Sequence, residues 1–366
     1  MTGTSRAPFQ PITVGRMKLS HRIAMAPLTR MRADNDTHVL PDMSLLYYEQ
    51  RASRPGTLII TESSFPSEKA GGFARVPGAY TKEQMDQWKK VYDKIHAKNC
   101  YVFHQLLALG RVAQSAQLGN NSVVSASDVS TSDGESCRPL TSSEIREYIA
   151  DFAQAARNAI DNGADGVEIH AGNGYLLDQF LHENTNKRTD NYGGSIENRA
   201  RFVLEAVDAV ADAIGPDRTA VRLAPWGQYG EVNYGISPIP QWGYLAAELE
   251  RRKRDGKELA YVHLIEPRVH ENTDRECGPQ ESNDFFRLIY SGTLIRAGAL
   301  ADINTIEKLV SQDDRLLVAL GRYFVSNPDL VDRLEHGYEL TKYNRPTFYT
   351  DGAEGYIDYP FYTPNK

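Results

Sequence analysis

The sequence predicts an α/β fold, and within that class a single (β/α)8 TIM barrel that spans residues 1–366. Two observations support this prediction. Short apolar runs alternate with amphipathic helical stretches, and about eight such strand–helix units follow one another. No Pro-, Gly- or Ser-rich linker, charge block or low-complexity segment divides the chain. A doubly wound sheet shares this alternation, so the count alone leaves that fold open.

The expected strands are short segments rich in β-branched and other apolar residues, the composition typical of a buried parallel sheet. They cover residues 22–26, 58–61, 101–106, 166–170, 219–223, 261–265, 293–296 and 316–320. In a parallel barrel the chemistry lies where the strands end and the following loops begin. The residues after each segment are therefore the first candidates for a site.

Helical stretches lie between most of these strands. Thr141 and Glu144 have the spacing of a capping box, and apolar residues recur at helical spacing from Ile145 to Ala156. Further helices are expected over residues 195–214, 240–254 and 327–336.

Two other segments complete the predicted architecture. A short N-terminal element over residues 9–19 precedes the first strand, and we expect it to cap the barrel floor. The longest irregular stretch runs from about residue 110 to residue 139 and is rich in serine. Loops of this length commonly form a lid or a binding wall, so we expect long loops at the C-terminal mouth.

Composition excludes several classes of protein. The net charge of −7 gives no reason to expect nucleic-acid binding. No run approaches the roughly 18 apolar residues that cross a bilayer. Neither end of the chain matches a targeting signal, which makes a cytoplasmic location the default expectation. The sequence does not distinguish a monomer from a homodimer.

Motif searches argue against several kinds of binding and catalytic site. The cysteines, Cys100, Cys137 and Cys277, are few and far apart, which argues against disulfide, zinc and iron–sulfur frameworks, so no metal is expected. Gly172 and Gly174 follow a strand, but Leu177 occupies the position of the third glycine in a dinucleotide fingerprint. The strand ends also lack the paired carboxylates of a glycosidase, and no strand contains a Schiff-base lysine.

The last two strand ends suggest a phosphate site. Gly298 follows the seventh strand, and Gly321 with Arg322 follows the eighth. Glycines allow backbone N–H groups to approach an anion, and a guanidinium offers a planar fork for its oxygens. For either loop alone a turn glycine and a surface arginine would suffice, but the two together favour phosphate.

Gln105 and Arg222 lie on strands that bring them to the barrel mouth. An amide can pair with the pyrimidine end of a flavin, and a cation near N1 would stabilise the negative charge of the reduced ring. A structural ion pair explains Arg222 equally well. Both interpretations remain open from the residues alone.

The segment EIHAGNGYLLDQFL leaves the fourth strand and presents His170, Asn173 and Tyr175 within six positions. A strand-to-helix turn has no need of an imidazole, an amide and a phenol. Taken singly, His170 could be a core histidine and Tyr175 a buried aromatic residue with a bonded hydroxyl. His104 and His263, which also lie in predicted strands, are interpreted as structural.

The chain resembles the Old Yellow Enzyme family of FMN-dependent ene-reductases, close to its fungal branch, nearly from end to end. The motifs that carry the resemblance are APLTRMRA, PGTLIITE, HQLLALGR, GADGVEIHAGNGYLLDQFLHENTNKRTDNYGGSIENRARF, VRLAPWG, LIRAGA, GRYFVSNPDLVDRL and GYIDYP. The resemblance implies a barrel with FMN across its mouth and a ping-pong reaction. NADPH would reduce the flavin, which would then pass a hydride to the β-carbon of an enone or enal.

The resemblance also implies roles for individual residues. His170 and Asn173 would donate hydrogen bonds to the substrate carbonyl oxygen, and Tyr175 would protonate the α-carbon. The flavin would be bound by Pro27, Leu28, Thr29, Ser63, Gln105, Arg222, Gly298, Ala299, Gly321 and Arg322. The substrate pocket would be walled by Phe73, Leu107, Trp226 and Tyr349.

The chain departs from the family pattern at a few positions. Leu107 stands where close relatives often have tryptophan, which opens that side of the pocket. HAGNGY replaces the commoner HGANGY but keeps the spacing of the three polar residues, and the segment 268–283 is individual. The alternatives are a flavin-dependent isomerase or reductase of a secondary-metabolite pathway, a flavin-free barrel that binds a sugar phosphate, and a noncatalytic binding protein.

Overall fold

The computed structural model describes residues 6–270, 273–298 and 300–364, and a closed barrel of eight strands forms its centre. In barrel order the strands are β3 (Ile23–Met25), β4 (Leu58–Ile60), β5 (Tyr101–Leu106), β8 (Gly166–Ala171), β9 (Thr219–Leu223), β10 (Tyr261–Ile265), β13 (Leu294–Ala297) and β14 (Leu316–Leu320). All neighbours pair in parallel, and β14 closes the ring on β3. The predicted barrel is confirmed, and closure excludes the doubly wound sheet.

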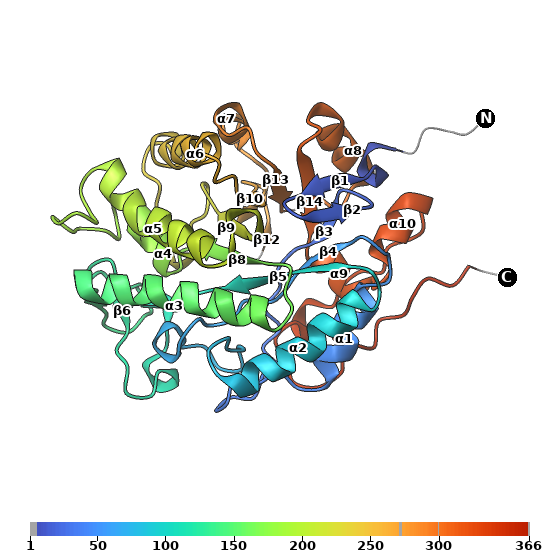
Figure 1. Cartoon of the computed structure of the whole chain (residues 1–366), viewed down its shortest axis with the longest axis horizontal. Helices are drawn as coiled ribbons and strands as arrows, with labels where there is room; N and C mark the ends of the chain where they lie inside the picture. Colours follow the sequence, from blue (N-terminus) through green and yellow to red (C-terminus); the bar gives the residue numbers. More distant parts are fainter. Residues whose placement is uncertain (1–5, 271–272, 299, 365–366) are drawn as a thin grey trace.

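Helices surround the barrel on its outer side (Figure 1). The longer ones are α1 (Met43–Arg51), α2 (Lys82–His96), α3 (Ser142–Asp161), α5 (Ile196–Ile214), α6 (Ile239–Arg254), α8 (Ile303–Gln312) and α10 (Leu330–His336). Three are short, namely α4 (Leu176–Leu181), α7 (Asp284–Ile289) and α9 (Arg322–Ser326). The alternation of strand and helix carries the chain once around the ring.

The helix starts follow the capping signals of the sequence. The Thr141 hydroxyl accepts the Glu144 backbone N–H at 3.2 Å, and the Glu144 carboxylate accepts the Thr141 N–H at 2.8 Å. Caps of this kind stabilise a helix by about 1 kcal/mol. The helix expected at 327–336 begins only at Leu330, so that boundary was wrong. Asn327 ends α9 by donating its N–H to the Tyr323 carbonyl, and Pro328, which has no N–H, follows.

Alternate strand residues face the helices and the barrel axis. On β8, Val167 and Ile169 belong to the helix-facing core, whereas Glu168 and His170 lie on the inner side. The inner positions are apolar near the barrel floor, where the buried cluster contains Leu58, Ile60, Phe103, Ala220, Tyr261, Ile295 and Leu317. They become polar toward the C-terminal ends of the strands, and this polar layer supports the site.

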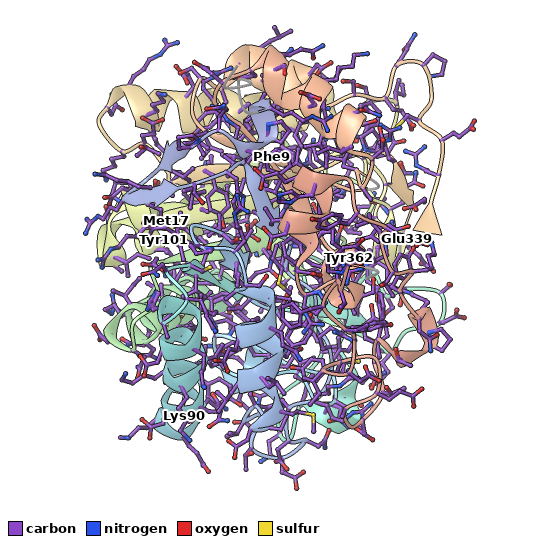
Figure 2. The ribbon with its side chains drawn as sticks, turned by 90° about the vertical axis from the view of Figure 1, so that its right-hand side faces the viewer. Phe9, Met17, Lys90, Tyr101, Glu339 and Tyr362 are labelled. Atoms are coloured by element: carbon purple, nitrogen blue, oxygen red, sulfur yellow. The ribbon has the colours of Figure 1, made fainter. Side chains whose placement is uncertain are left out.

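An N-terminal hairpin closes the floor as predicted. Strands β1 (Ile12–Val14) and β2 (Met17–Leu19) pair antiparallel, after the short 3-10 helix η1 (Ala7–Phe9). Met17 and Leu19 are buried in the same cluster as the lower barrel residues. Figure 2 shows Met17 beside Tyr101, whose hydroxyl accepts a hydrogen bond from the Lys18 N–H. The hairpin thus covers the end of the barrel opposite the mouth.

The irregular stretch 110–139 contains the 3-10 helices η3 (Gly110–Val112) and η4 (Ser115–Gln117) and the strands β6 (Val124–Ser125) and β7 (Arg138–Pro139). It packs against the segments that follow β8 and β9, because the Ser125 hydroxyl donates to the Gln179 side-chain oxygen at 2.9 Å and Arg111 donates to the Gly230 carbonyl at 2.5 Å. The structure therefore makes it a support for the site, whereas we expected a lid or a binding wall.

The C-terminal segment crosses back to the barrel mouth and is bound there by buried arginines. Arg30 donates to the Gly355 carbonyl at 2.8 Å, and Arg32 donates to the Phe348 carbonyl at 3.0 Å. The Arg32 guanidinium also lies 4.4 Å from the centre of the Tyr356 ring. These contacts hold the 3-10 helix η7 (Arg345–Thr347) and the residues after it in place.

Two further short strands, β11 (Val269–His270) and β12 (Thr273–Asp274), form a hairpin after β10, and the 3-10 helices η2 (Glu68–Ala70), η5 (Pro216–Arg218) and η6 (Tyr229–Glu231) lie in other loops.

Candidate active site

A cavity of about 380 Å³ opens at the C-terminal ends of the barrel strands. Every strand, or the loop after it, contributes to its wall. Fifteen of the residues predicted from the sequence line it: Pro27, Leu28, Thr29, Ser63, Phe73, Gln105, Leu107, His170, Asn173, Tyr175, Arg222, Gly298, Gly321, Arg322 and Tyr349. Residues from nine separate parts of the chain thus meet in one site.

Two predicted residues are not placed there. Trp226 does not line the cavity, because its ring is 8% exposed and packs edge-on against Tyr234, with 5.5 Å between the ring centres. Ala299 lies outside the residues that the structure describes. The stretch 110–139 contributes η3 to the support behind the wall and no residue to the lining.

The turn after β8 presents the three polar side chains. Asn173 has φ +54° and Gly174 has φ +68°, so the backbone reverses sharply within two residues. The Gly174 N–H donates to Asp178 and its carbonyl accepts from Gln179, each at 2.8 Å. A Cβ on Gly174 would lie 1.9 Å from the Tyr229 carbonyl oxygen, so glycine is required for this close approach. The first turn of α4 therefore fixes the turn.

His170 is a neutral histidine. It is 3% exposed, and burial together with the charge of Arg222 holds its pKa well below the usual value. Its Nδ1 atom has no hydrogen-bond partner among the described residues. A neutral imidazole with an unsatisfied ring nitrogen at a cavity wall is available to a ligand.

Tyr175 and Tyr229 form a pair of phenols on one side of the cavity. Their ring centres are 5.7 Å apart, and the Tyr175 ring lies edge-on to His170 at 5.3 Å. Burial raises the pKa of Tyr175, and its interaction with Tyr229, including a hydrogen bond, adds to the rise. The hydroxyl of Tyr175 is therefore fully protonated at neutral pH. Sequence reasoning missed Tyr229, although it follows Trp226 by three positions.

Gln105 and Arg222 line the cavity and interact with the buried Glu168 inside the barrel. The Gln105 amide nitrogen donates to Glu168 at 2.6 Å, and its oxygen accepts from the Ser63 hydroxyl. Burial lowers the pKa of the Arg222 guanidinium, and the charge on Glu168 offsets part of this effect. The Nε atom of Arg222 has no protein partner among the described residues. His263, which we interpreted as structural, also contacts Glu168.

The loops after β13 and β14 bring Gly298, Gly321 and Arg322 to the cavity. Gly298 has φ +115°, a conformation that side chains rarely adopt. A Cβ on Gly321 would approach the Leu28 side chain to 3.2 Å. Arg322 donates to the Tyr343 hydroxyl at 3.0 Å and pairs with Asp274.

These features fit FMN. The unsatisfied nitrogens of His170 and Arg222 and the oriented amide of Gln105 supply polar partners for a flavin ring. The small residues beside Arg322 leave room for a phosphate close to the backbone. Other lining residues were not predicted, and most come from loops or strand positions that carry no motif: Ala26, Met31, Val76, Tyr229, Ile265, Ala297, Ala319, Leu320, Tyr323, Arg345 and Phe348.

Two negative findings apply to the described parts of the chain. Within residues 6–270, 273–298 and 300–364, no helix combines the length and apolar character that crossing a membrane requires. In the same ranges, no three or more His, Cys, Asp or Glu side chains are grouped so that they could hold a metal ion.

Comparison with known proteins identifies the family. The model of the NADH:flavin oxidoreductase / NADH oxidase family matches residues 8–341. Enoate reductase 1 of Kluyveromyces lactis is 46% identical over 372 residues, covering 97% of this chain and 94% of its own. Chanoclavine-I aldehyde reductase of Penicillium roqueforti is 43% identical and covers 96% of both chains.

A solved structure agrees with these relatives. The crystal structure of Old Yellow Enzyme from Pichia sp. AKU4542 superposes with a TM-score of 0.91 at 37% identity, covering 98% of this chain and 95% of that one. The flavin-free alternative is thereby removed. This chain belongs to the NADH:flavin oxidoreductase / NADH oxidase family and is an FMN-dependent oxidoreductase of the Old Yellow Enzyme type.

Proposed function

We propose that this protein is an ene-reductase that reduces the carbon–carbon double bond of α,β-unsaturated carbonyl compounds. The observation that carries the proposal is the convergence of His170, Asn173 and Tyr175 on the cavity that also contains Gln105, Arg222 and the glycines beside Arg322. One wall thus offers polar groups suited to a carbonyl and a proton transfer. The remaining walls suit the flavin.

Bound FMN supplies the hydride chemistry, because it accepts a hydride from a reduced nicotinamide and passes it to the β-carbon of the substrate. Gln105 and Arg222 would hold the pyrimidine edge, and Thr29 and Ser63 would contact the ring together with Pro27 and Leu28. Gly298, Gly321 and Arg322, with Ala299, would hold the phosphate. We propose NADPH as the reductant and the whole chain, residues 1–366, as one FMN-binding domain.

His170 and Asn173 would bind the substrate carbonyl oxygen. Negative charge grows on that oxygen as the double bond is reduced, so donors that are already in place stabilise the transition state more than the ground state. The low pKa of His170 keeps the imidazole neutral, and one ring N–H can then donate. The left-handed conformation of Asn173 is held by the packed turn, so the amide need not reorganise.

Tyr175 would protonate the α-carbon. Its pKa lies above the usual value chiefly because the surrounding protein desolvates the phenol, so the proton is present when the basic enolate forms. Tyr229 hydrogen-bonds to Tyr175 and, like Tyr175, is half-buried, so it would return a proton to Tyr175 after each turnover. Phe73, Leu107 and Tyr349 would enclose the small-molecule enone or enal.

The decisive experiment starts from the absorption spectrum of the purified protein. A yellow protein that is bleached by NADPH without oxygen and regains its colour with cyclohexenone, with saturated ketone as product, supports the proposal. Bleaching without recovery under cyclohexenone and under a second enone would refute it.

The isomerase alternative is tested in the same reaction. The similarity to the Penicillium roqueforti protein, whose name records reduction of an aldehyde, favours enals among the substrates to test. Stoichiometric NADPH consumption with a saturated product indicates reduction. Movement of the double bond without net consumption of NADPH indicates isomerisation.

A further inference from the structure

Glu168 is a buried carboxylate on the barrel axis to which the proposed chemistry assigns no role. It lies on β8 two residues before His170 and is paired in register with Gln105 on β5. Its side chain is 0% exposed. Burial of a carboxylate costs several kcal/mol unless charges and hydrogen bonds offset it. The surrounding residues must therefore supply charges and hydrogen bonds that offset this cost.

Both oxygens of Glu168 are bonded. One accepts the amide nitrogen of Gln105 at 2.6 Å, and the other lies 2.9 Å from Nδ1 of His263. The Gln105 oxygen is at the same time the acceptor of the Ser63 hydroxyl. These contacts fix the orientation of the Gln105 amide, with its nitrogen toward Glu168 and its oxygen toward Ser63. Glu168 thus determines how Gln105 presents its remaining N–H and lone pair.

Glu168 also carries charge beneath the cavity. Burial raises the pKa of this carboxyl, but His263, Arg222 and Gln105 outweigh that effect, so the pKa lies below the usual value and the group is ionised at neutral pH. Burial keeps the pKa of His263 low despite the carboxylate. A single negative charge therefore faces the single positive charge of Arg222 in this layer.

We propose that Glu168 is a positioning residue that sets the reduction potential of the bound flavin. The inference rests on the proposed seating of the flavin against Gln105 and Arg222. Hydride transfer from the nicotinamide adds two electrons and one proton, so the reduced ring gains one negative charge. Arg222 stabilises that charge, and Glu168 opposes it while holding Gln105 in the orientation that pairs with the ring.

The negative charge of Glu168 assists the second half of the reaction, in which the reduced flavin reduces the alkene. A flavin that was held too firmly in its reduced form would accept a hydride readily but release it slowly to an alkene. Glu168 weakens the effect of Arg222 without removing Arg222 from the pyrimidine edge. We therefore expect that neutralising Glu168 speeds flavin reduction by NADPH and slows reoxidation by the enone.

The test is Glu168→Gln in the FMN-loaded enzyme, which removes the charge and keeps the shape. With the flavin and a reference dye at equilibrium without oxygen at pH 7.5, the ratio of reduced to oxidised FMN should rise at least tenfold, which is about 30 mV for a two-electron couple. Glu168→Asp, which keeps the charge, should change the ratio less than threefold. An unchanged ratio in Glu168→Gln, or equal changes in the two variants, would overturn the proposal.

A matched control lies just before the start of the same strand. Asp165 precedes β8 by one residue and contacts His96 at 2.9 Å, but it lies at the floor end. Asp165→Asn removes a histidine-paired carboxylate roughly 10 Å from Glu168 along the strand, at ~3.3 Å per residue. Its flavin ratio should stay within twofold of the wild type, and a tenfold rise would overturn the proposal.

A lone uncompensated Arg222 could prevent Glu168→Gln from folding. The double variant Glu168→Gln/Arg222→Gln buries neither charge. Its ratio should lie within threefold of the wild type, whereas Arg222→Gln alone should lower the ratio at least tenfold. A double variant as low as Arg222→Gln alone would overturn the proposal. Because the ratio is measured without substrate, failure of this inference is distinct from failure of enone reduction.

Discussion

The titration of Glu62 gives a quantitative prediction for stability. This carboxyl lies two residues after β4, next to Ser63 of the cavity, and is 1% exposed. Burial raises its pKa from 4.5 to about 7, although the Arg30 N–H and the Tyr48 hydroxyl, each at 3.3 Å, act in the opposite direction. The protonated form is thus favoured in the folded protein relative to the unfolded chain.

The sign of the pH effect follows from this shift. A carboxyl whose pKa is raised by folding contributes its full stabilisation below pH 4.5 and loses it as the pH rises through about 7. At about 1.4 kcal/mol for each pKa unit, the whole effect is roughly 3 kcal/mol. The amide of Glu62→Gln cannot ionise. Between pH 5 and pH 8, the wild type should therefore lose about 2–3 kcal/mol of unfolding free energy relative to Glu62→Gln.

The assay is denaturant unfolding of both FMN-saturated proteins at several pH values, because all other titrating groups cancel in the difference. Glu83→Gln, on the exposed first turn of α2, is the control for loss of a surface carboxylate. A difference between wild type and Glu62→Gln that stays constant from pH 5 to pH 8 would show that Glu62 titrates normally and that the burial argument is wrong.

Four further predictions concern the cavity. Tyr175→Phe should slow enone-dependent reoxidation by about 10²–10⁴-fold and leave NADPH-dependent reduction within threefold, as measured by stopped-flow absorbance; equal losses in both halves would contradict its role as acid. Tyr229→Phe should slow reoxidation by about tenfold with an altered solvent isotope effect, and an unchanged rate and isotope effect would exclude the relay. Gly174→Ala should lower the unfolding free energy by about 1–3 kcal/mol and reduce turnover, because its Cβ meets the Tyr229 carbonyl; wild-type stability in denaturant would contradict the close approach. Leu107→Trp should change the enantiomer formed from prochiral enones on chiral chromatography, and identical products on several enones would refute a role for this wall.

The strands and most helices were predictable because one periodic signal defines each of them. Apolar runs with β-branched residues mark the buried parallel strands, and the Thr141 capping box marks the start of α3. The miss at residue 327 has a local cause. Asn327 caps the end of α9, and Pro328 separates it from α10. The apolar residues on both sides of this break keep a helical spacing, so periodicity alone predicts one helix that starts too early.

The site was predictable where residues sit on strands or in a short turn with a fixed geometry. Trp226 and Tyr229 show the limit. They lie three residues apart in an irregular loop that includes Gly230 at φ +64°, so sequence spacing does not reveal which ring faces the cavity. The pairing of Glu168 with His263 is equally invisible in the sequence, because it depends on the register of strands that are 95 residues apart.

The charge of the cavity wall connects the fold to the proposed chemistry. Although the protein carries a net charge of −7, the described lining includes Arg222, Arg322 and Arg345 and no aspartate or glutamate. Such a wall favours a phosphate-bearing cofactor and an anionic reductant. The same wall would also stabilise the negative charge of the reduced flavin, and this would slow transfer of the hydride to the substrate. A carboxylate such as Glu168, placed one layer below the cavity and not in its wall, can moderate that effect without repelling the ligands, and this explains why the polar layer lies inside the barrel.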